Sequence, residues 1–190
     1  MFGPGKHTEG ELLVGYIEAQ LESLRATAYG LSDEQARATP CRSALSIGGL
    51  IKHATYVMGQ RERQRADPGA MPDDAGVALF LGSFALTVDE TLGSALAEFD
   101  QARDTYLADV RDTDPGADVV APPAPWDGRF GPTDSVQRFH LVHHIEEFAR
   151  HAGHADIIRE QLDGASAASL LMAVEGRPGN AFIQPWTPPA

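Results

Sequence analysis

Five of the seven histidines of this chain lie in one segment, residues 140–164, which reads HLVHHIEEFARHAGHADIIREQLDG. At about 100° per residue, a helix would place six polar side chains of this segment within about 60° of one line: His140, His143, His144, Glu147, His151 and His154. The same line continues into Ile158 and Leu162, so we expect it to face the interior. Buried imidazoles and carboxylates are costly unless they are paired or bind a metal, so the pattern indicates a metal site.

Glu147 and His151 are four residues apart, which on a helix makes a clamp of two ligands. A third ligand should come from a facing helix. His53 is the only histidine in residues 46–65, and it lies between Leu50 and Val57 on the apolar side of that segment. Two imidazoles and one carboxylate suit Zn²⁺, and also Fe²⁺, Co²⁺ or Ni²⁺. Three protein ligands would leave an open position for water or a substrate thiol.

Simpler explanations exist for each part of this set. A single core histidine is usually just hydrogen-bonded, and a Glu/His pair at this spacing is often a solvated stripe. The density of histidines and the apolar continuation of their line support both parts of the set together, and the residues alone leave the metal site and the simpler explanations about equally favoured. Di-iron bundles use Glu-x-x-His twice, whereas here Glu-x-x-x-His occurs once, which favours a mononuclear site.

Further candidates for catalysis or positioning surround this set: Tyr56, Gln60, His143, His144 and His154. His154, three residues beyond His151, could be a fourth ligand, a hydrogen-bond partner of a ligand or a general base. His144 and its neighbour lie one turn before Glu147 and could orient its carboxylate by a hydrogen bond. Tyr56 would line the pocket or belong to an interface without a chemical role.

The elements that must position these residues are four long helices, predicted from apolar spacing over residues 10–29, 46–65, 88–111 and 135–162. We expect one all-α domain over residues 1–190, an antiparallel four-helix bundle. Ser32–Gln35 predicts a capping box and a short helical turn, and Thr133 or Asp134 is the expected N-cap of the last helix. No strand is expected. The Pro/Gly-rich loop 112–134, with Trp126, would cover the site, and the tail 165–190 would pack through Phe182, Ile183 and Trp186.

Composition excludes several classes of protein. Fifteen Lys and Arg against 27 Asp and Glu give a net charge of −12, which argues against binding to nucleic acids or anionic membranes. No apolar run reaches transmembrane length, and the first residues lack the apolar core of a signal peptide. The lone Cys41 permits no internal disulfide and fits a reducing compartment. We therefore expect a cytoplasmic protein, which could pair as a homodimer.

Three segments resemble the DinB-like (YfiT-like) family of four-helix-bundle metalloenzymes, in particular its actinobacterial mini-circle-type branch: GLSDEQARATPCRSALSIGGLIKHATYVMGQRER, HLVHHIEEFARHAGHADIIREQLDG and FIQPW. The resemblance implies a divalent metal bound by one histidine of the second long helix and two residues four apart on the last. Many members have two histidines there. The Glu147–His151 version is similar to the metal-binding domain of mycothiol-dependent maleylpyruvate isomerase, which implies His53, Glu147 and His151 as ligands.

The resemblance also implies chemistry, because the wider family includes thiol S-transferases that use mycothiol, bacillithiol or glutathione. The implied cofactor is one divalent ion, zinc first, and the implied cosubstrate is mycothiol. The metal would favour the thiolate and present it to a small electrophile, with His154 as a base for the proton. A metal-dependent hydrolase and a non-catalytic protein that binds a metal or small molecule remain the alternatives.

Overall fold

The computed structural model of the chain describes residues 2–67, 70–124 and 127–188. Its helices are α1 (Glu9–Ala26), α2 (Asp33–Arg37), α3 (Ile47–Ala66), α4 (Asp74–Gly82), α5 (Leu92–Arg111), α6 (Gln137–Asp163) and α7 (Ala167–Val174). Two short strands, β1 (Asp118–Ala121) and β2 (Thr133–Val136), form an antiparallel pair. The protein is therefore predominantly helical, as the apolar spacing predicted.

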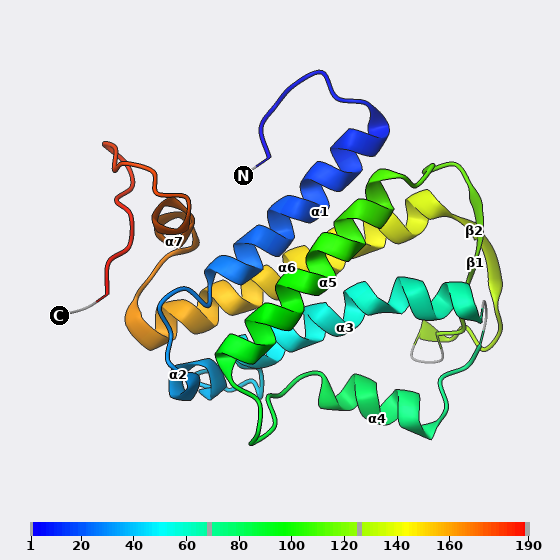
Figure 1. Ribbon diagram of the computed structural model, residues 1–190, viewed down its shortest axis with the longest axis horizontal. Helices are drawn as coiled ribbons and strands as arrows, with labels where there is room; N and C mark the ends of the chain where they lie inside the picture. Colours follow the sequence, from blue (N-terminus) through cyan, green and yellow to red (C-terminus); the bar gives the residue numbers. More distant parts are fainter. Residues whose placement is uncertain (1, 68–69, 125–126, 189–190) are drawn as a thin grey trace.

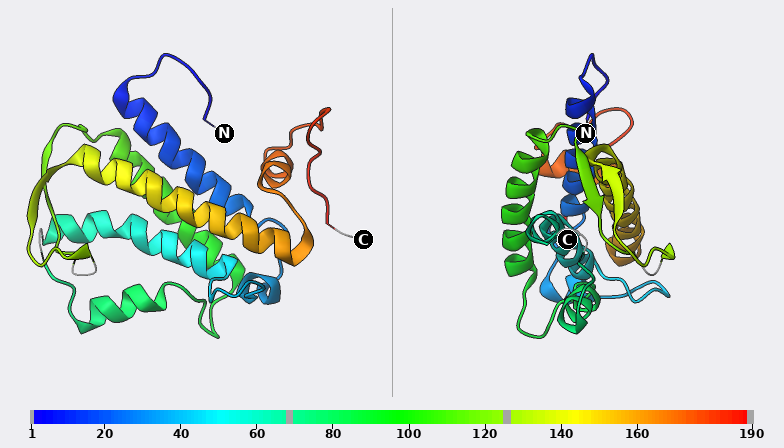
Figure 2. Two further views of the ribbon diagram at one scale, coloured as in Figure 1. Left: turned by 180° about the vertical axis from the view of Figure 1, so that it is seen from behind. Right: turned by 90° about the vertical axis from the view of Figure 1, so that its right-hand side faces the viewer.

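The long helices α1, α3, α5 and α6 lie side by side around one hydrophobic core (Figures 1 and 2). Helix α6 packs against α1 and α3, and α5 packs against the same two helices. The fully buried members of this core come from all four helices and include Ile17, Leu50, Phe99 and Phe148. This packing brings the α3 and α6 faces that carry the predicted ligands toward each other.

Side-chain caps explain where several helices begin. Thr8 and Glu11 form a capping box at α1, and Ser32 and Gln35 form the one predicted for α2. Thr91 accepts a hydrogen bond from the Ser94 amide, so α5 starts at Leu92 rather than at the predicted residue 88. Helix α6 ends where Gly164 takes a left-handed conformation with φ 76°.

The segment between α5 and α6 differs from the prediction. Val119 and Val120 favour extended backbone and pair with residues before α6, so a two-stranded sheet forms where no strand was expected. Thr133, an expected cap, belongs to β2 instead, and α6 begins after Val136 without a side-chain cap. Trp126, which we expected to help cover the site, lies outside the described residues.

The C-terminal half of α6 is fixed to the end of α1 by a buried guanidinium. Arg159 is fully buried and donates to the carbonyl oxygens of Thr27 and Tyr29, both at 2.7 Å, and to the carboxylate of Asp163. The ring of Trp186 stacks over this guanidinium at 4.7 Å. Trp186 thus packs the tail as predicted, whereas Phe182 is 93% exposed and does not.

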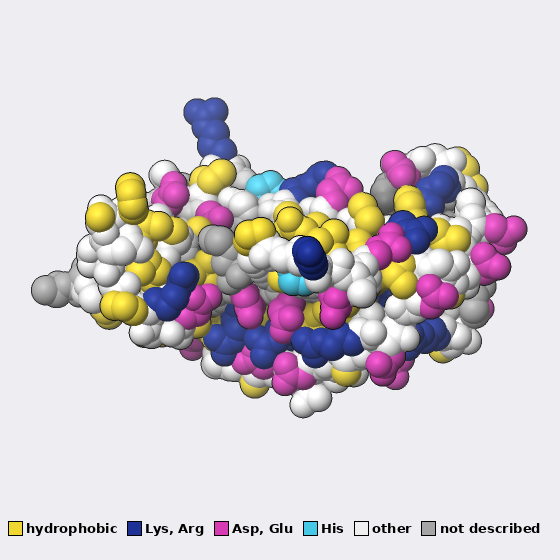
Figure 3. Space-filling model, turned by 90° about the horizontal axis from the view of Figure 1, so that it is seen from above, with side chains coloured by type: hydrophobic (Ala, Val, Ile, Leu, Met, Phe, Trp, Pro, Cys, Tyr) yellow, Lys and Arg dark blue, Asp and Glu magenta, His cyan; other side chains and the backbone are white. Residues whose placement is uncertain are grey.

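The surface carries charges of both signs. Acidic and basic side chains are interspersed over the face seen from above in Figure 3, although the chain as a whole is acidic. No helix in the described part of the chain has both the length and the apolar character needed to cross a bilayer.

Candidate metal centre

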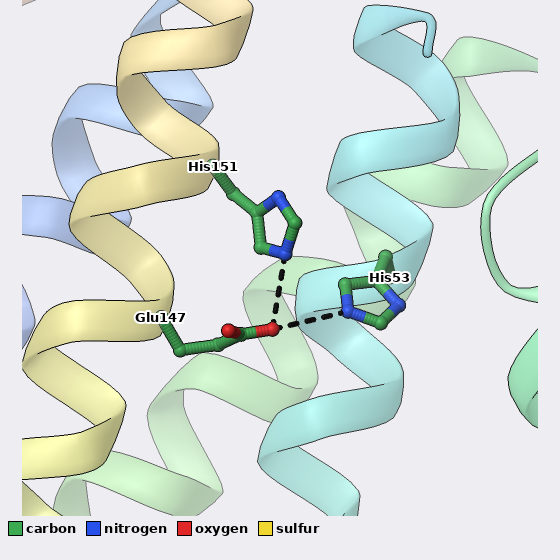
Figure 4. Close-up of side chains that lie close together, drawn as sticks. All are labelled: His53, Glu147 and His151. Atoms are coloured by element: carbon green, nitrogen blue, oxygen red, sulfur yellow. Dashed lines mark hydrogen bonds and ion pairs between the residues drawn. The ribbon is translucent and has the colours of Figure 1, made fainter. Parts of the chain in front are cut away.

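Helices α3 and α6 bring three potential ligand side chains together where the two helices face each other (Figure 4). The Glu147 Oε1 atom lies 3.3 Å from His53 Nε2 and 3.0 Å from His151 Nε2. One ligand atom from each of the three residues lies within 4.8 Å of the others. His53 is 2% exposed and His151 is 8% exposed, so the cluster is largely shielded from water.

The neighbours of His53 determine which of its ring nitrogens carries the proton. Its Nδ1 atom lies 2.8 Å from the Ser83 hydroxyl, which itself donates to the Phe80 carbonyl oxygen at 2.6 Å. Since that hydroxyl proton is already used, His53 Nδ1–H must donate to Ser83 Oγ. In neutral His53 the unprotonated Nε2 then faces a carboxylate oxygen. Two acceptors at this distance require a cation between them, either a proton or a metal ion.

The carboxyl group of Glu147 is held in its ionised form. The hydrogen bond with His151, first of all, holds the pKa of Glu147 well below its usual range and outweighs the opposing effect of burial. An ionised carboxylate between two imidazoles is a donor set suited to Zn²⁺ and other first-row divalent ions.

The spacing of the ligand atoms also fits a single ion. Zinc binds imidazole nitrogen and carboxylate oxygen at about 2.1 Å, so ligands in a tetrahedral arrangement lie about 3.4 Å apart. The two separations from Glu147 Oε1, 3.3 and 3.0 Å, are close to that value. These separations are those expected of ligands that share one divalent metal ion.

Aromatic rings enclose the His53 side of the cluster. Phe84 stacks on the His53 ring with 3.9 Å between centroids, and Phe80 meets it edge-on at 5.9 Å. Tyr56, the predicted pocket residue, stacks near the same imidazole at 6.3 Å. The two phenylalanines and Ser83 come from α4 and the turn after it. Sequence reasoning missed them because residues 74–82 are apolar without a helical stripe and α4 buries none of its residues.

Two of the other predicted histidines lie at the edge of the cluster or outside it. His154 is exposed, with its ring 5.8 Å from that of His151. His143 is also exposed, and its ring is near Glu146 rather than Glu147. On the opposite side of the His151 ring, the Nδ1 atom is buried and has no hydrogen-bond partner among the described residues.

His144 differs from its prediction, because it bonds to α5 instead of to Glu147. Its Nδ1 atom lies 2.6 Å from the hydroxyl of Tyr106, and both side chains are buried. Burial, first of all, lowers the pKa of His144 to about 3 and raises the pKa of Tyr106 well above 10. The pair is therefore neutral at physiological pH. The apolar spacing of residues 88–111 predicted that Tyr106 faces the core, but it did not predict the hydrogen bond with His144.

The sequence matches the family model described as mycothiol S-transferase over residues 12–164. No curated protein sequence matches the chain. Among solved structures, a conserved protein from Enterococcus faecalis is similar with a TM-score of 0.51 and 14% identity, over 84% of this chain and 99% of that one. At that identity the likeness concerns the fold alone.

Proposed function

Because this chain belongs to the mycothiol S-transferase family, we propose that it joins mycothiol to small electrophilic molecules at a metal centre between α3 and α6. The observation that carries this proposal is the convergence of His53 Nε2, His151 Nε2 and the Glu147 carboxylate. We further propose that the four long helices are the antiparallel bundle expected of DinB-like proteins.

His53, Glu147 and His151 would hold one divalent ion, zinc first, with Fe²⁺, Co²⁺ and Ni²⁺ also suited to these donors. Such an ion, when bound, lowers the pKa of a thiol at its open position and so favours the nucleophilic thiolate. Ser83 would fix His53 with Nε2 free to coordinate, and Glu147 would stay ionised over the working pH range.

The surrounding side chains would exclude water from the metal centre and accept the thiol proton. Phe80 and Phe84 cover His53 on one side and exclude water there. His154 lies on the open side next to His151 and would take the proton that the thiol releases. The thiol sulfur then forms a bond to an electrophilic carbon, and a leaving group departs with the electron pair of the bond that breaks.

The test is conjugation of mycothiol to monobromobimane, in which the sulfur replaces bromide and the product becomes fluorescent. Metal-loaded protein should raise the rate above the uncatalysed reaction. Both the chelator-treated protein and the His53→Ala variant should lose this excess. Bacillithiol and glutathione serve as comparison thiols. If no thiol reacts faster with the metal-loaded protein than without it, the transferase proposal is wrong, and a metal-dependent hydrolase or a binding protein becomes the better account.

A further inference from the structure

A cavity of about 360 Å³ opens between the C-terminal part of α3, the N-terminal part of α6 and β1. Ligand sites for small molecules have volumes of roughly 300–1,000 Å³. The β1 residues Asp118, Val119 and Val120 line part of the cavity, and the two helices contribute six residues with polar side chains: Arg61, Gln64, Arg65, Gln137, His140 and His144. None of these residues belongs to the cluster of potential metal ligands.

The cavity and the metal centre involve nearly the same faces of α3 and α6, at different positions along these helices. His140 precedes Glu147 by seven residues, which is about 10.5 Å along α6, on nearly the same helix face. Gln64 follows His53 by eleven residues, again on nearly the same face of α3. The cavity and the metal cluster are therefore both built on the sides of α3 and α6 that face each other.

The wall offers unused hydrogen-bonding groups. The Nε2 atom of His140 is buried and has no hydrogen-bond partner among the described residues. The hydrogen bond between the Tyr106 hydroxyl and His144 Nδ1 occupies that nitrogen, so Nε2 is the nitrogen of His144 that remains for a ligand. Gln64 adds an amide, which both donates and accepts. A ligand with several hydroxyl groups, each able to donate and accept, matches this mixture.

The charges in the wall argue against an anionic ligand. Arg61 uses its guanidinium on three acceptors, Asp109, Gln137 and Thr113, at 2.6–3.1 Å. Arg65 pairs with the same Asp109 carboxylate, and Asp118 adds a second negative charge at the rim. Two guanidinium groups thus face two carboxylates, so the cavity carries little net charge. An uncharged polyhydroxylated group therefore fits better than a phosphate or a carboxylate.

We propose that this cavity binds the uncharged, polyhydroxylated part of the thiol cosubstrate while the thiol sulfur reaches the metal centre. The inference rests on the proposed function and deepens it. In mycothiol a cysteinyl amide links the thiol to two hydroxylated six-membered rings, so the sulfur and the ring hydroxyl groups lie at opposite ends of the molecule. His140 and Gln64 are then specificity-determining residues for the headgroup.

The test compares His140→Ala, Gln64→Ala and their double variant with the parent protein. Two thiols are used as substrates, mycothiol and N-acetylcysteine, which has the thiol end without the rings. The KM for mycothiol should rise about tenfold in the double variant, as expected for the loss of about two modest hydrogen bonds. The kcat, the metal content and the KM for N-acetylcysteine should stay unchanged. Gln161→Ala, an exposed position on the same helix, is the matched control.

A binding measurement separates this inference from the proposed function. The NMR signals of the thiol-free N-acetylglucosamine–inositol fragment, which is uncharged because its amine is acylated as in mycothiol, should broaden on titration with the parent protein. The broadening should disappear with the double variant. Arg65→Ala, with a side chain 58% exposed and thus safe for folding, should also weaken it. Headgroup binding without turnover would support the cavity and refute the transferase. Turnover with an unchanged KM in every variant, or an equal loss for both thiols, would overturn the cavity and leave the transferase standing.

Discussion

The Nδ1 atom of His53 lies 2.8 Å from the hydroxyl of Ser83, thirty residues later in the chain. Ser83 follows the apolar helix α4 and is itself buried. This contact aims the opposite ring nitrogen of His53 at Glu147. Helix α4 buries none of its own residues. Its C-cap residue Ser83 nevertheless orients His53, a potential metal ligand on α3.

The first prediction concerns this contact. Ser83→Ala should lower the affinity for zinc about 10- to 100-fold, because His53 loses the acceptor that fixes its orientation and tautomer. Competition titration with a chromophoric chelator measures the change. Ser23→Ala, which removes a partly buried hydroxyl from α1, should leave the affinity unaltered. An unchanged affinity in Ser83→Ala would mean that the hydroxyl does not orient the ligand.

The second prediction concerns pH and His144. Its pKa is about 3 in the folded protein against 6.5 as the ordinary value, so the unfolded chain takes up a proton first as the pH falls. The free energy of unfolding should therefore decrease between pH 6.5 and pH 3. His144→Gln should remove about 3 kcal/mol of this decrease between pH 7 and pH 4. Urea unfolding of chelator-treated proteins at both pH values checks it, and parallel profiles for parent and variant would contradict it.

The third prediction concerns Asp156, whose ionisation lowers the free energy of unfolding as the pH rises, opposite to the effect of His144. Burial, with help from the charge of Glu160, raises the pKa of Asp156 from 3.8 to about 6, and its Oδ1 atom is buried without a partner among the described residues. The folded protein binds this proton more tightly, so the ionised carboxylate destabilises the fold above pH 6. Asp156→Asn should raise the free energy of unfolding at pH 7.5 by about 1 kcal/mol, a value reduced for partial solvent exposure.

Thermal unfolding at two pH values tests this assignment. The increase in stability caused by Asp156→Asn should be smaller at pH 4, because the carboxyl group of the parent protein is already protonated in the folded state there. Asp104→Asn, on the exposed side of α5, is the control and should have little effect. A variant that is no more stable than the parent at pH 7.5 would show that the Asp156 carboxylate is not a strained group.

The fourth prediction concerns Arg159. Arg159→Ala should destabilise the protein by about 3–5 kcal/mol, since it leaves the buried carboxylate of Asp163 and two carbonyl oxygens of the α1 end without their donor. Urea unfolding measures the loss. Arg177→Ala, which removes a partly exposed ion pair, should cost less than about 1 kcal/mol. Equal, small effects in both variants would contradict the role of Arg159 as a clamp.

Helical spacing predicted the parts of the site that depend on one helix. The pairing of Glu147 with His151 and the inward position of His53 follow from local geometry, and the structure brings these residues together. The same spacing overestimated the width of the buried face of α6. His143 and His154 belong to the predicted line but are exposed, whereas His144 and His151 of the same line are buried.

The contacts that spacing could not predict join segments far apart in the chain. Ser83 and Phe84 contact His53 of α3 from the turn that follows the apolar helix α4. Tyr106 of α5 contacts His144 of α6. The strands were missed because their four-residue runs are too short to show alternation. Such contacts depend on how helices dock, which the periodicity of a single segment does not encode.

The most direct test of the metal centre is the metal content of purified protein loaded with excess zinc and then desalted. The parent protein should retain one zinc ion per chain, while His53→Ala and His151→Ala should retain well below half. His7→Ala, which removes an exposed histidine outside the cluster, should match the parent. Full zinc retention in both cluster variants would contradict the assignment of His53, Glu147 and His151 as the ligands.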